Sequence, residues 1–300
     1  MNGALLLIAA NEKCPQPQTR EHLTALEIIG VKNVVVVQNK IDLMEREKTI
    51  ENQKEIRAML QGTSMADAPI IPVSANHNVN IDVLIQAIQE HIPSAKREEG
   101  KAPLMYVARS FDINRPGTRP KDLTGGVLGG SLLQGNLKVG DEIEVRPGPT
   151  SHEGVASEKI LTKVTSLMSG GHDLQELHPG GLAAIGTMLD PSMTKGDALT
   201  GRLVGKPGSL PPVTTKVRLR ANLLERVVGS QRELKVEKIK TSEVLTLTMG
   251  TTIAPGKVTS ARGDDVEISL TRPVTFFPGS RVAISRRLNA WRLIGYGIVQ

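Results

Sequence analysis

Residues 34–42 read VVVVQNKID, and this stretch decides the fold of the N-terminal part of the chain. The run VVVVQ at 34–38 is strongly β-branched and predicts a strand. The polar residues Asn39, Lys40 and Asp42 follow this strand directly. Because α/β folds bind ligands beyond the carboxyl ends of their parallel strands, the stretch predicts a binding loop as well as a strand.

Two further strands and three helices are predicted around this stretch. The apolar runs at 4–10 and 69–73 predict strands, and apolar residues at helical spacing predict helices at 18–29, 45–61 and 81–92. Strands and helices that alternate in this way form a parallel sheet with helices packed on it. We therefore expect an α/β domain over residues 1–93.

The pattern changes after Ile92. Residues 94–102 are polar and charged and predict a linker, and the rest of the chain consists of short β-rich runs separated by Gly, Pro and Asp. Strands at this spacing are typical of barrels or sandwiches, and the remaining length is enough for two of them. A Pro- and Gly-rich segment at 203–212 predicts the joint. The expected fold is α/β plus all-β, with β-barrels at 103–207 and 208–300.

Composition excludes several classes of protein. The single cysteine, Cys14, excludes an internal disulfide framework and a cysteine-based zinc site. No run of eighteen or more apolar residues is present, and the N-terminus lacks the basic region of a signal peptide. We therefore expect a cytoplasmic protein that does not act at a membrane.

The loop at 39–42 has the residues that guanine recognition requires. The carboxylate of Asp42 can accept two parallel hydrogen bonds from the N1–H and the N2 amino group of guanine, a pair of donors that adenine does not present. Asn39 can contact the base edge or tie neighbouring loops together, and the aliphatic stem of Lys40 can lie across the base while its ammonium group stays in water. A chance tetrapeptide in a polar turn is the alternative.

A second loop strengthens this interpretation. Ser74, Ala75 and Asn76 follow the next predicted strand, and the backbone amide of Ala75 can donate to guanine O6. Two such loops at successive strand ends are more specific than either one, because both must converge on one base. The candidate guanine-binding residues are Asn39, Lys40, Asp42, Ser74, Ala75 and Asn76.

These loops resemble the fourth and fifth sequence motifs of the translational GTPases. Residues 11–23, NEKCPQPQTREHL, resemble the gamma subunit of translation initiation factor 2, as do RSFDIN at 109–114 and WRLIG at 291–295. The resemblance implies that residues 1–93 are the C-terminal half of a GTP-binding domain followed by two β-barrels. It also implies binding of GTP or GDP and of methionyl initiator tRNA, for delivery to the small ribosomal subunit.

The phosphate-binding part of such a domain is not present in these 300 residues. No G-x-x-x-x-G-K-[ST] loop occurs, and the nearest spacings, at 201–206 and 250–257, are one residue too short and one too long. The family's D-x-P-G-H motif and the switch threonine that binds Mg²⁺ are also missing, so we assign no catalytic or metal-binding residue. We expect an N-terminally truncated member of the family that binds nucleotide weakly or not at all and does not hydrolyse GTP alone.

The charge is concentrated in the last third of the chain. Residues 201–300 contain 17 Lys and Arg against 7 Asp and Glu, a net charge of +10, whereas residues 1–200 carry 20 against 24, a net charge of −4, which gives +6 for the whole chain. A concentrated basic surface favours a polyanion such as tRNA, although a solvated basic face is the alternative. The candidate phosphate contacts are Lys216, Arg218, Arg220, Arg281, Arg286, Arg287 and Arg292.

The resemblance implies two protein partners, the alpha and beta subunits of the same factor. The loops at 114–126 and 147–158 are candidates for contact with the alpha subunit, because they are long and rich in Gly, Pro and charge. Two other functions remain open. The chain could be a non-enzymatic tRNA- or subunit-binding module derived from the family, or a selenocysteine-specific elongation factor, which shares the sequence PQTREH.

Overall fold

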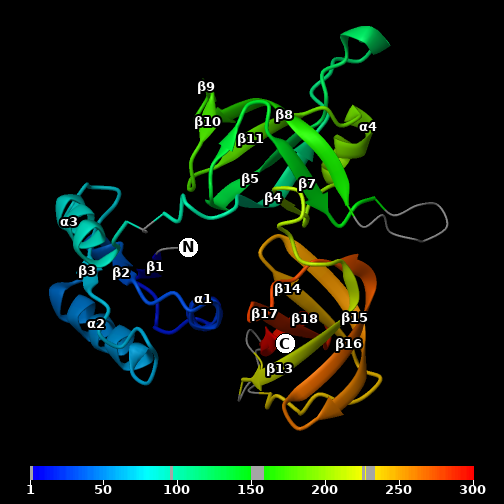
Figure 1. Ribbon diagram of the computed structural model, residues 1–300. Coiled ribbons are helices and arrows are strands. Elements are labelled where there is room, and N and C mark those ends of the chain that lie inside the picture. The colour runs from blue at the N-terminus through cyan, green and yellow to red at the C-terminus, as the bar shows by residue number, and fades with distance from the viewer. Residues whose placement is uncertain (1–2, 95–96, 150–158, 225–226, 228–233) are drawn as a thin grey trace. The chain divides into compact units, whose positions relative to one another are not determined.

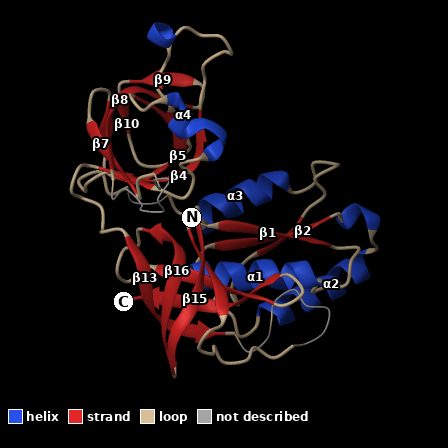
Figure 2. Cartoon of the chain, turned by 90° about the vertical axis from the view of Figure 1, so that its right-hand side faces the viewer, coloured by secondary structure: helices blue, strands red, loops and turns tan. Residues whose placement is uncertain are grey.

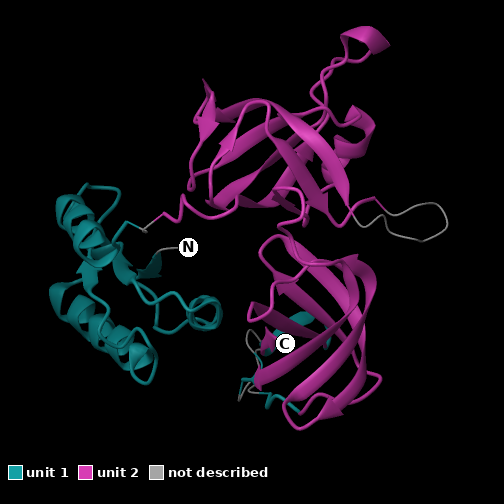
Figure 3. Cartoon of the chain, viewed as in Figure 1, with its two compact units in different colours: residues 1–95, 223–237, 288–295 teal, residues 96–222, 238–287, 296–300 magenta. Residues whose placement is uncertain are grey.

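The protein is described by a computed structural model that covers residues 3–94, 97–149, 159–224, 227 and 234–300. Most of the loop at 147–158 lies outside these residues. The chain divides into two compact units (Figure 3). The first comprises residues 1–95, 223–237 and 288–295, and the second comprises residues 96–222, 238–287 and 296–300.

The N-terminal part is a three-stranded parallel sheet with helices on both faces. Its strands lie in the order β1 (Ala4–Ala9), β2 (Val34–Asn39) and β3 (Ile70–Pro72). Helix α3 (Ile81–His91) covers one face, whereas α1 (Pro17–Ile29) and α2 (Arg46–Leu60) cover the other (Figure 2). The predicted parallel sheet is confirmed, and each predicted element agrees with the structure to within two residues.

The valine strand lies at the centre of this sheet. Val34 to Val37 are each at most 3% exposed, because β2 pairs with a strand on both edges and is covered by helices on both faces. Ile56 and Leu60 from α2 are fully buried against the same core. Helix α1 ends at Gly30, whose φ of 78° is the left-handed conformation that glycine adopts without a steric cost.

The middle of the chain forms a β-barrel (Figure 1). Six strands lie in the order β11-β5-β4-β12-β7-β8. The barrel closes because the first of them, β11, pairs with β5 on one edge and with the last, β8, on the other. Gly130 allows β5 to approach β4 closely, since a Cβ there would lie 2.0 Å from the carbonyl oxygen of Tyr106. The strands β6 (Leu137–Lys138) and β10 (Glu176–Leu177) form a separate two-stranded antiparallel sheet. The other elements of this part of the chain are β4 (Leu104–Phe111), η2 (Pro120–Asp122), β5 (Val127–Gln134), β7 (Glu142–Arg146), β8 (Ile160–Ser169), β9 (His172–Leu174), β11 (Ala183–Thr187), α4 (Pro191–Thr194), η3 (Lys195–Asp197) and β12 (Leu203–Gly205).

The C-terminal strands form a second closed barrel, in the order β13-β16-β15-β14-β17-β18. Its strands are β13 (Thr214–Leu223), β14 (Val244–Met249), β15 (Thr252–Arg262), β16 (Asp265–Val274), β17 (Arg281–Arg287) and β18 (Trp291–Val299). The predicted fold class, a partial α/β domain followed by two β-barrels, is confirmed. Within the described ranges, no helix has the length and apolar character needed to cross a membrane.

Candidate functional site

The two predicted loops lie side by side, because they follow neighbouring strands β2 and β3 of the parallel sheet. Asn39 is the last residue of β2, and its side-chain oxygen accepts a hydrogen bond from the backbone amide of Ala75 at 3.1 Å. The same oxygen accepts from the amide of Lys40 at 2.8 Å. Of the two roles predicted for Asn39, the structure therefore shows the one that ties the loops together.

This contact occupies the amide that was predicted to face guanine. The N–H of Ala75 donates to Asn39, so guanine O6 must share this donor or displace Asn39 from it. Lys40 has a φ of 64°, a conformation that costs a bulky residue of order 1–3 kcal/mol and is concentrated at functional sites. The backbone beside it is held across the sheet, since Val73 donates to Gln38 O at 2.8 Å and Ile41 donates to Val73 O at 3.3 Å.

Asp42 lies in the short helix η1 (Ile41–Leu43), beside the second loop. The nearby hydroxyl of Ser74 holds the pKa of the Asp42 carboxyl below its usual value, with smaller contributions from the carboxyl's own backbone amide and from His77. Ser74 Oγ itself makes no hydrogen bond of good geometry within the described residues, so its effect on Asp42 comes from proximity. His77 Nε2 lies 3.6 Å from Asp42 Oδ2. Asp42 is therefore an ionised, acceptor-only group at neutral pH, as guanine recognition requires.

A buried polar network positions the end of β2, and the sequence analysis missed it. The Gln38 side chain is fully buried and donates to Asn52 Oδ1 and to Thr49 O, both at 2.9 Å. Asn52 in turn donates to Glu12 O at 3.0 Å. The sequence signal for this network is Gln38, which directly follows four valines. A glutamine in a buried strand needs hydrogen-bond partners for its side-chain amide, so its position predicts a polar network nearby.

Metal binding requires a cluster of side chains that can hold the ion. Mg²⁺ prefers several oxygen ligands at short distances, usually with one or two carboxylates. No group of three or more His, Cys, Asp or Glu side chains with metal-binding geometry exists among the residues that the structure describes. Asp42 is the carboxylate at the two loops, and its predicted task is to contact the base.

Three of the predicted tRNA contacts lie on one strand of the second barrel. Lys216, Arg218 and Arg220 alternate along β13 with residues that point into the barrel, and all three are exposed. Arg218 lies 3.6 Å from Glu267, an exposed ion pair that does not prevent contact with a phosphate. These three side chains form a basic row on the outside of the barrel.

The other four candidates, Arg281, Arg286, Arg287 and Arg292, differ in their burial and in the contacts of their side chains. Arg286 is mostly buried and forms a two-point ion pair with Glu243. The guanidinium of Arg281 lies over the Tyr296 ring, 4.6 Å from its centre. Arg292 donates to Glu21 at 3.4 Å, and both residues belong to the first unit. Arg287 is exposed at the end of β17.

Three known families match successive parts of the chain. Residues 1–94 match the elongation factor Tu GTP-binding domain, and residues 125–200 match elongation factor Tu domain 2. Residues 215–299 match the C-terminal domain of initiation factor eIF2 gamma. The order of the matches follows the order of the α/β part and the two barrels.

Whole-chain comparisons find close relatives. The chain is 56% identical to translation initiation factor 2 subunit gamma of Pyrococcus furiosus, and 55% identical to that of Methanocaldococcus jannaschii. Both comparisons cover 100% of this chain and 74% of the relative. The selenocysteine-specific elongation factors described next are only 20–21% identical to this chain.

Solved structures agree with the fold. Translation elongation factor SelB of Methanococcus maripaludis, in complex with the GTP analogue GppNHp, matches 100% of this chain and 65% of its own, with a TM-score of 0.77 at 20% identity. A bacterial selenocysteine-specific elongation factor matches 99% of this chain and 44% of its own, with a TM-score of 0.77 at 21% identity. At this identity the likeness concerns the fold alone.

Proposed function

Since the chain belongs to the family of gamma subunits of translation initiation factor 2, we propose that its loops at 39–42 and 74–76 bind the guanine base of GTP or GDP. The observation that carries this proposal is the hydrogen bond from the Ala75 amide to Asn39, which joins two loops from neighbouring strands. Asp42 lies beside the second loop as an ionised carboxylate. It would accept from guanine N1–H and N2, while the stem of Lys40 covers the base.

Nucleotide binding by these 300 residues is proposed to be weak. Charge-assisted hydrogen bonds to phosphate oxygens are among the strongest contacts a nucleotide makes, and the chain contains no glycine-rich loop to provide them. The family's switch motif, which orients water, and its Mg²⁺-binding threonine are also missing from these 300 residues. We therefore propose base recognition without GTP hydrolysis by this chain alone.

The barrels are proposed to bind methionyl initiator tRNA for delivery to the small ribosomal subunit. The basic row of Lys216, Arg218 and Arg220 supports this role, because its side chains are exposed on one face of a strand. Arg287 is exposed on β17 of the same barrel. Contacts with the alpha and beta subunits of the factor, and a cytoplasmic location, follow from the family. We also propose that the domains are residues 1–93, 103–207 and 208–300, with residues 94–102 as the linker.

An NMR titration with GDP tests the guanine site. We expect backbone signals of residues 39–42 and 74–76 to shift with GDP and not with ADP. A dissociation constant above about 1 μM is expected, because only the base is held. Asp42→Asn replaces a carboxylate oxygen, which accepts hydrogen bonds, by an amide NH2 group, which donates them. This donor faces the N2 amino donor of guanine unfavourably but can donate to the O2 of xanthine. It should weaken GDP binding at least about tenfold and favour xanthosine diphosphate.

Asp67→Asn is the matched control for this experiment. Asp67 is exposed in the turn before β3, at the opposite end of that strand from the two loops. Asp67→Asn removes the same charge, and it should leave the affinities for GDP and for xanthosine diphosphate unchanged. Equal shifts with GDP and ADP, or equal effects of the two variants, would refute guanine recognition at these loops. Sub-micromolar GDP affinity would refute weak binding and leave the site standing.

A further inference from the structure

A small basic pocket lies in the second unit, far along the chain from the guanine loops. Its volume is about 80 Å³, and its lining includes Gly148, Thr200, Arg202, Thr252 and Arg272. The residues come from both barrels. Two arginines line the pocket, and no Asp or Glu is among its described lining residues. Its chemistry therefore favours an anion.

Arg202 is held in place by backbone oxygens, without a carboxylate. Its Nε donates to Pro147 O at 2.7 Å and its Nη2 donates to Gly148 O at 3.4 Å. Burial, and then the positive charge of Arg272, lower the pKa of Arg202 from its ordinary value. Even so, an arginine stays protonated in proteins, so two positive charges persist side by side.

Arg272 is the less constrained of the two arginines. Its side chain is exposed on β16, and within the described part of the chain it has no hydrogen bond or ion pair. A guanidinium has five N–H donors in a flat fork, which suits the oxygens of a phosphate. Arg272 can therefore direct several donors toward a ligand in the pocket that Arg202 also lines.

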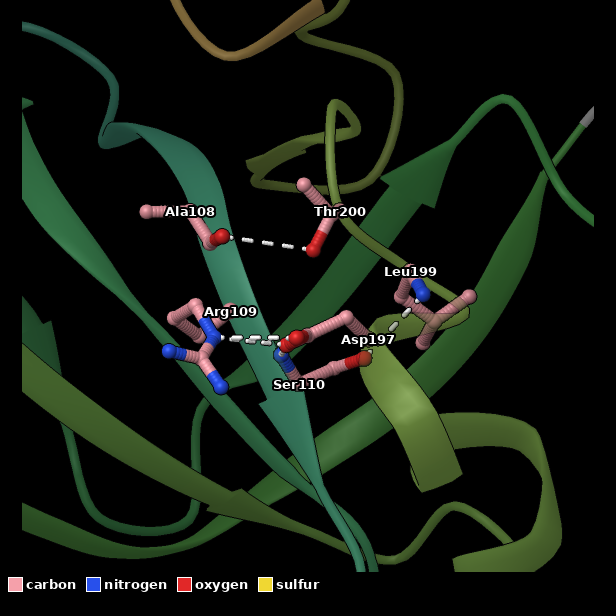
Figure 4. Close-up of polar contacts among 6 residues, drawn as sticks. All are labelled: Ala108, Arg109, Ser110, Asp197, Leu199 and Thr200. Carbon is pink, nitrogen blue, oxygen red and sulfur yellow. Dashed lines mark hydrogen bonds and ion pairs between the residues drawn. The ribbon is translucent and has the colours of Figure 1, made fainter.

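Hydrogen bonds and an ion pair join the segment just before Arg202 to β4, as the close-up in Figure 4 shows. The Thr200 hydroxyl donates to Ala108 O at 3.2 Å, and the amide of Leu199 donates to Ser110 Oγ at 3.1 Å. Asp197 accepts from the amide of Ser110 at 3.0 Å and forms an ion pair with Arg109. These bonds fasten the turn to β4, so Arg202 needs little ordering when a ligand binds.

The two barrels contact each other at Gly201, one of the residues that line the pocket. Thr252 Oγ1 donates to Gly201 O at 2.6 Å. Gly201 has a φ of 82°, and a Cβ there would lie 3.2 Å from Thr251 O, so a larger residue is both strained and crowded. Close approach at this glycine brings a residue near the end of the first barrel, Arg202, to the same cavity as Arg272 of the second.

We propose that this pocket binds one phosphate group. A tetrahedral anion offsets the charge of two neighbouring guanidinium groups. Arg272 can donate a pair of N–H groups to it, whereas the nitrogens of Arg202 each already donate to a backbone oxygen, so Arg202 contributes mainly its charge. A cavity of about 80 Å³ exceeds the roughly 30 Å³ that one water occupies in the liquid, which leaves room for a small anion. The phosphate can be a free ion or a phosphodiester of RNA, because both present the same oxygens. The inference does not depend on the guanine site.

Calorimetric titration of the whole chain with inorganic phosphate, at constant ionic strength, tests this proposal. We expect saturable binding that Arg272→Ala weakens at least about tenfold, because hydrogen bonds to charged groups are lost. Arg272→Lys keeps the charge and should lose less. Arg262→Ala is the matched control, because Arg262 is exposed at the opposite end of β15 from Thr252, which lines the pocket.

The dinucleotide ApA, which carries one phosphodiester, distinguishes the two sources of phosphate. Displacement of inorganic phosphate by ApA assigns the pocket to an RNA backbone, whereas binding of inorganic phosphate alone assigns it to the free ion. Melting temperatures of the variants confirm that each one folds. The proposal fails if neither ligand saturates the protein by about 10 mM, or if Arg262→Ala and Arg272→Ala weaken binding equally.

Discussion

The side-chain oxygen of Asn39 accepts a hydrogen bond from the backbone amide of Ala75 at 3.1 Å, across 36 residues of sequence. One side chain thus joins the loop after β2 to the loop after β3. The contact gives Asn39 a structural role and makes the geometry of both loops depend on it.

Asn39→Ala should destabilise the N-terminal domain by about 1 kcal/mol, since two backbone amides lose their acceptor. It should also broaden the NMR signals of residues 74–76, because the second loop is released. Urea denaturation measures the free energy of unfolding. Asn76→Ala is the control, because that exposed side chain makes a single contact at 3.5 Å with His77. Equal free energies of unfolding for Asn39→Ala and Asn76→Ala would show that the hydrogen bond between Ala75 and Asn39 does not stabilise the domain.

Cys14 should be nearly unreactive in the folded protein at pH 8. Burial, and then the Glu55 carboxylate, raise the pKa of its thiol to about 11, although Arg20 opposes the shift. Since the thiolate is the reactive form and an unfolded cysteine titrates near 8.5, its reaction with iodoacetamide should be at least about 100-fold slower in native than in urea-unfolded protein. Comparable rates in both states would refute the burial of this thiol.

The same shift makes stability depend on alkaline pH. Below about 8.5 both states keep the proton, so the contribution of Cys14 to stability is fully present. Between that value and about 11 the unfolded state alone loses its proton, so stability falls as pH rises. The difference in urea stability between the wild type and Cys14→Ala should therefore shift against the wild type from pH 8 to pH 10. A constant difference would contradict the raised pKa.

Glu144→Ala should cost about 3–5 kcal/mol, because it leaves a buried arginine charge without its carboxylate. Glu144 is fully buried, and Arg146 Nε lies 3.3 Å from its Oε1. The pair also holds the joint between the barrels, since Glu144 accepts from the Leu210 amide at 3.2 Å and Arg146 donates to Pro211 O at 3.1 Å. Denaturation measures the loss, and limited proteolysis should show new cleavage at 207–212.

Glu142→Ala on the same strand is the control for Glu144. Glu142 is exposed and lies 3.8 Å from Lys163, a pair expected to contribute about 0–1 kcal/mol. A loss for Glu144→Ala no larger than that for Glu142→Ala would show that the buried pair does not stabilise the joint.

Arg286→Ala and Arg287→Ala should have different effects, although the two residues are adjacent. Arg286 is held by Glu243, so its removal should destabilise the second barrel by about 1–3 kcal/mol. Arg287 is exposed, so its removal should leave stability unchanged and reduce the salt dependence of tRNA binding by about one phosphate contact. Filter binding with initiator tRNA over a range of salt measures the slope. An unchanged slope for Arg287→Ala removes it from the tRNA surface.

The local order of the N-terminal part was determined by the sequence alone. The β-branched run at 34–38 predicts a strand and the polar residues after it predict a ligand loop, because strand propensity is largely local, and the alternation of strands with helices predicts a parallel sheet. Alternation along 214–223 likewise placed Lys216, Arg218 and Arg220 on one outward face, since the side-chain period of a strand is two residues.

Only the tertiary structure decided which distant residues meet. The bond from Ala75 to Asn39, the ion pair of Arg286 with Glu243 and the cavity shared by Arg202 and Arg272 join residues 36 to 70 positions apart. Such contacts depend on strand order and on the close approach of the barrels at Gly201, which no local spacing encodes. Arg286 and Arg287 therefore look equivalent as a sequence pair and differ in the folded barrel, where one faces a carboxylate and the other faces solvent.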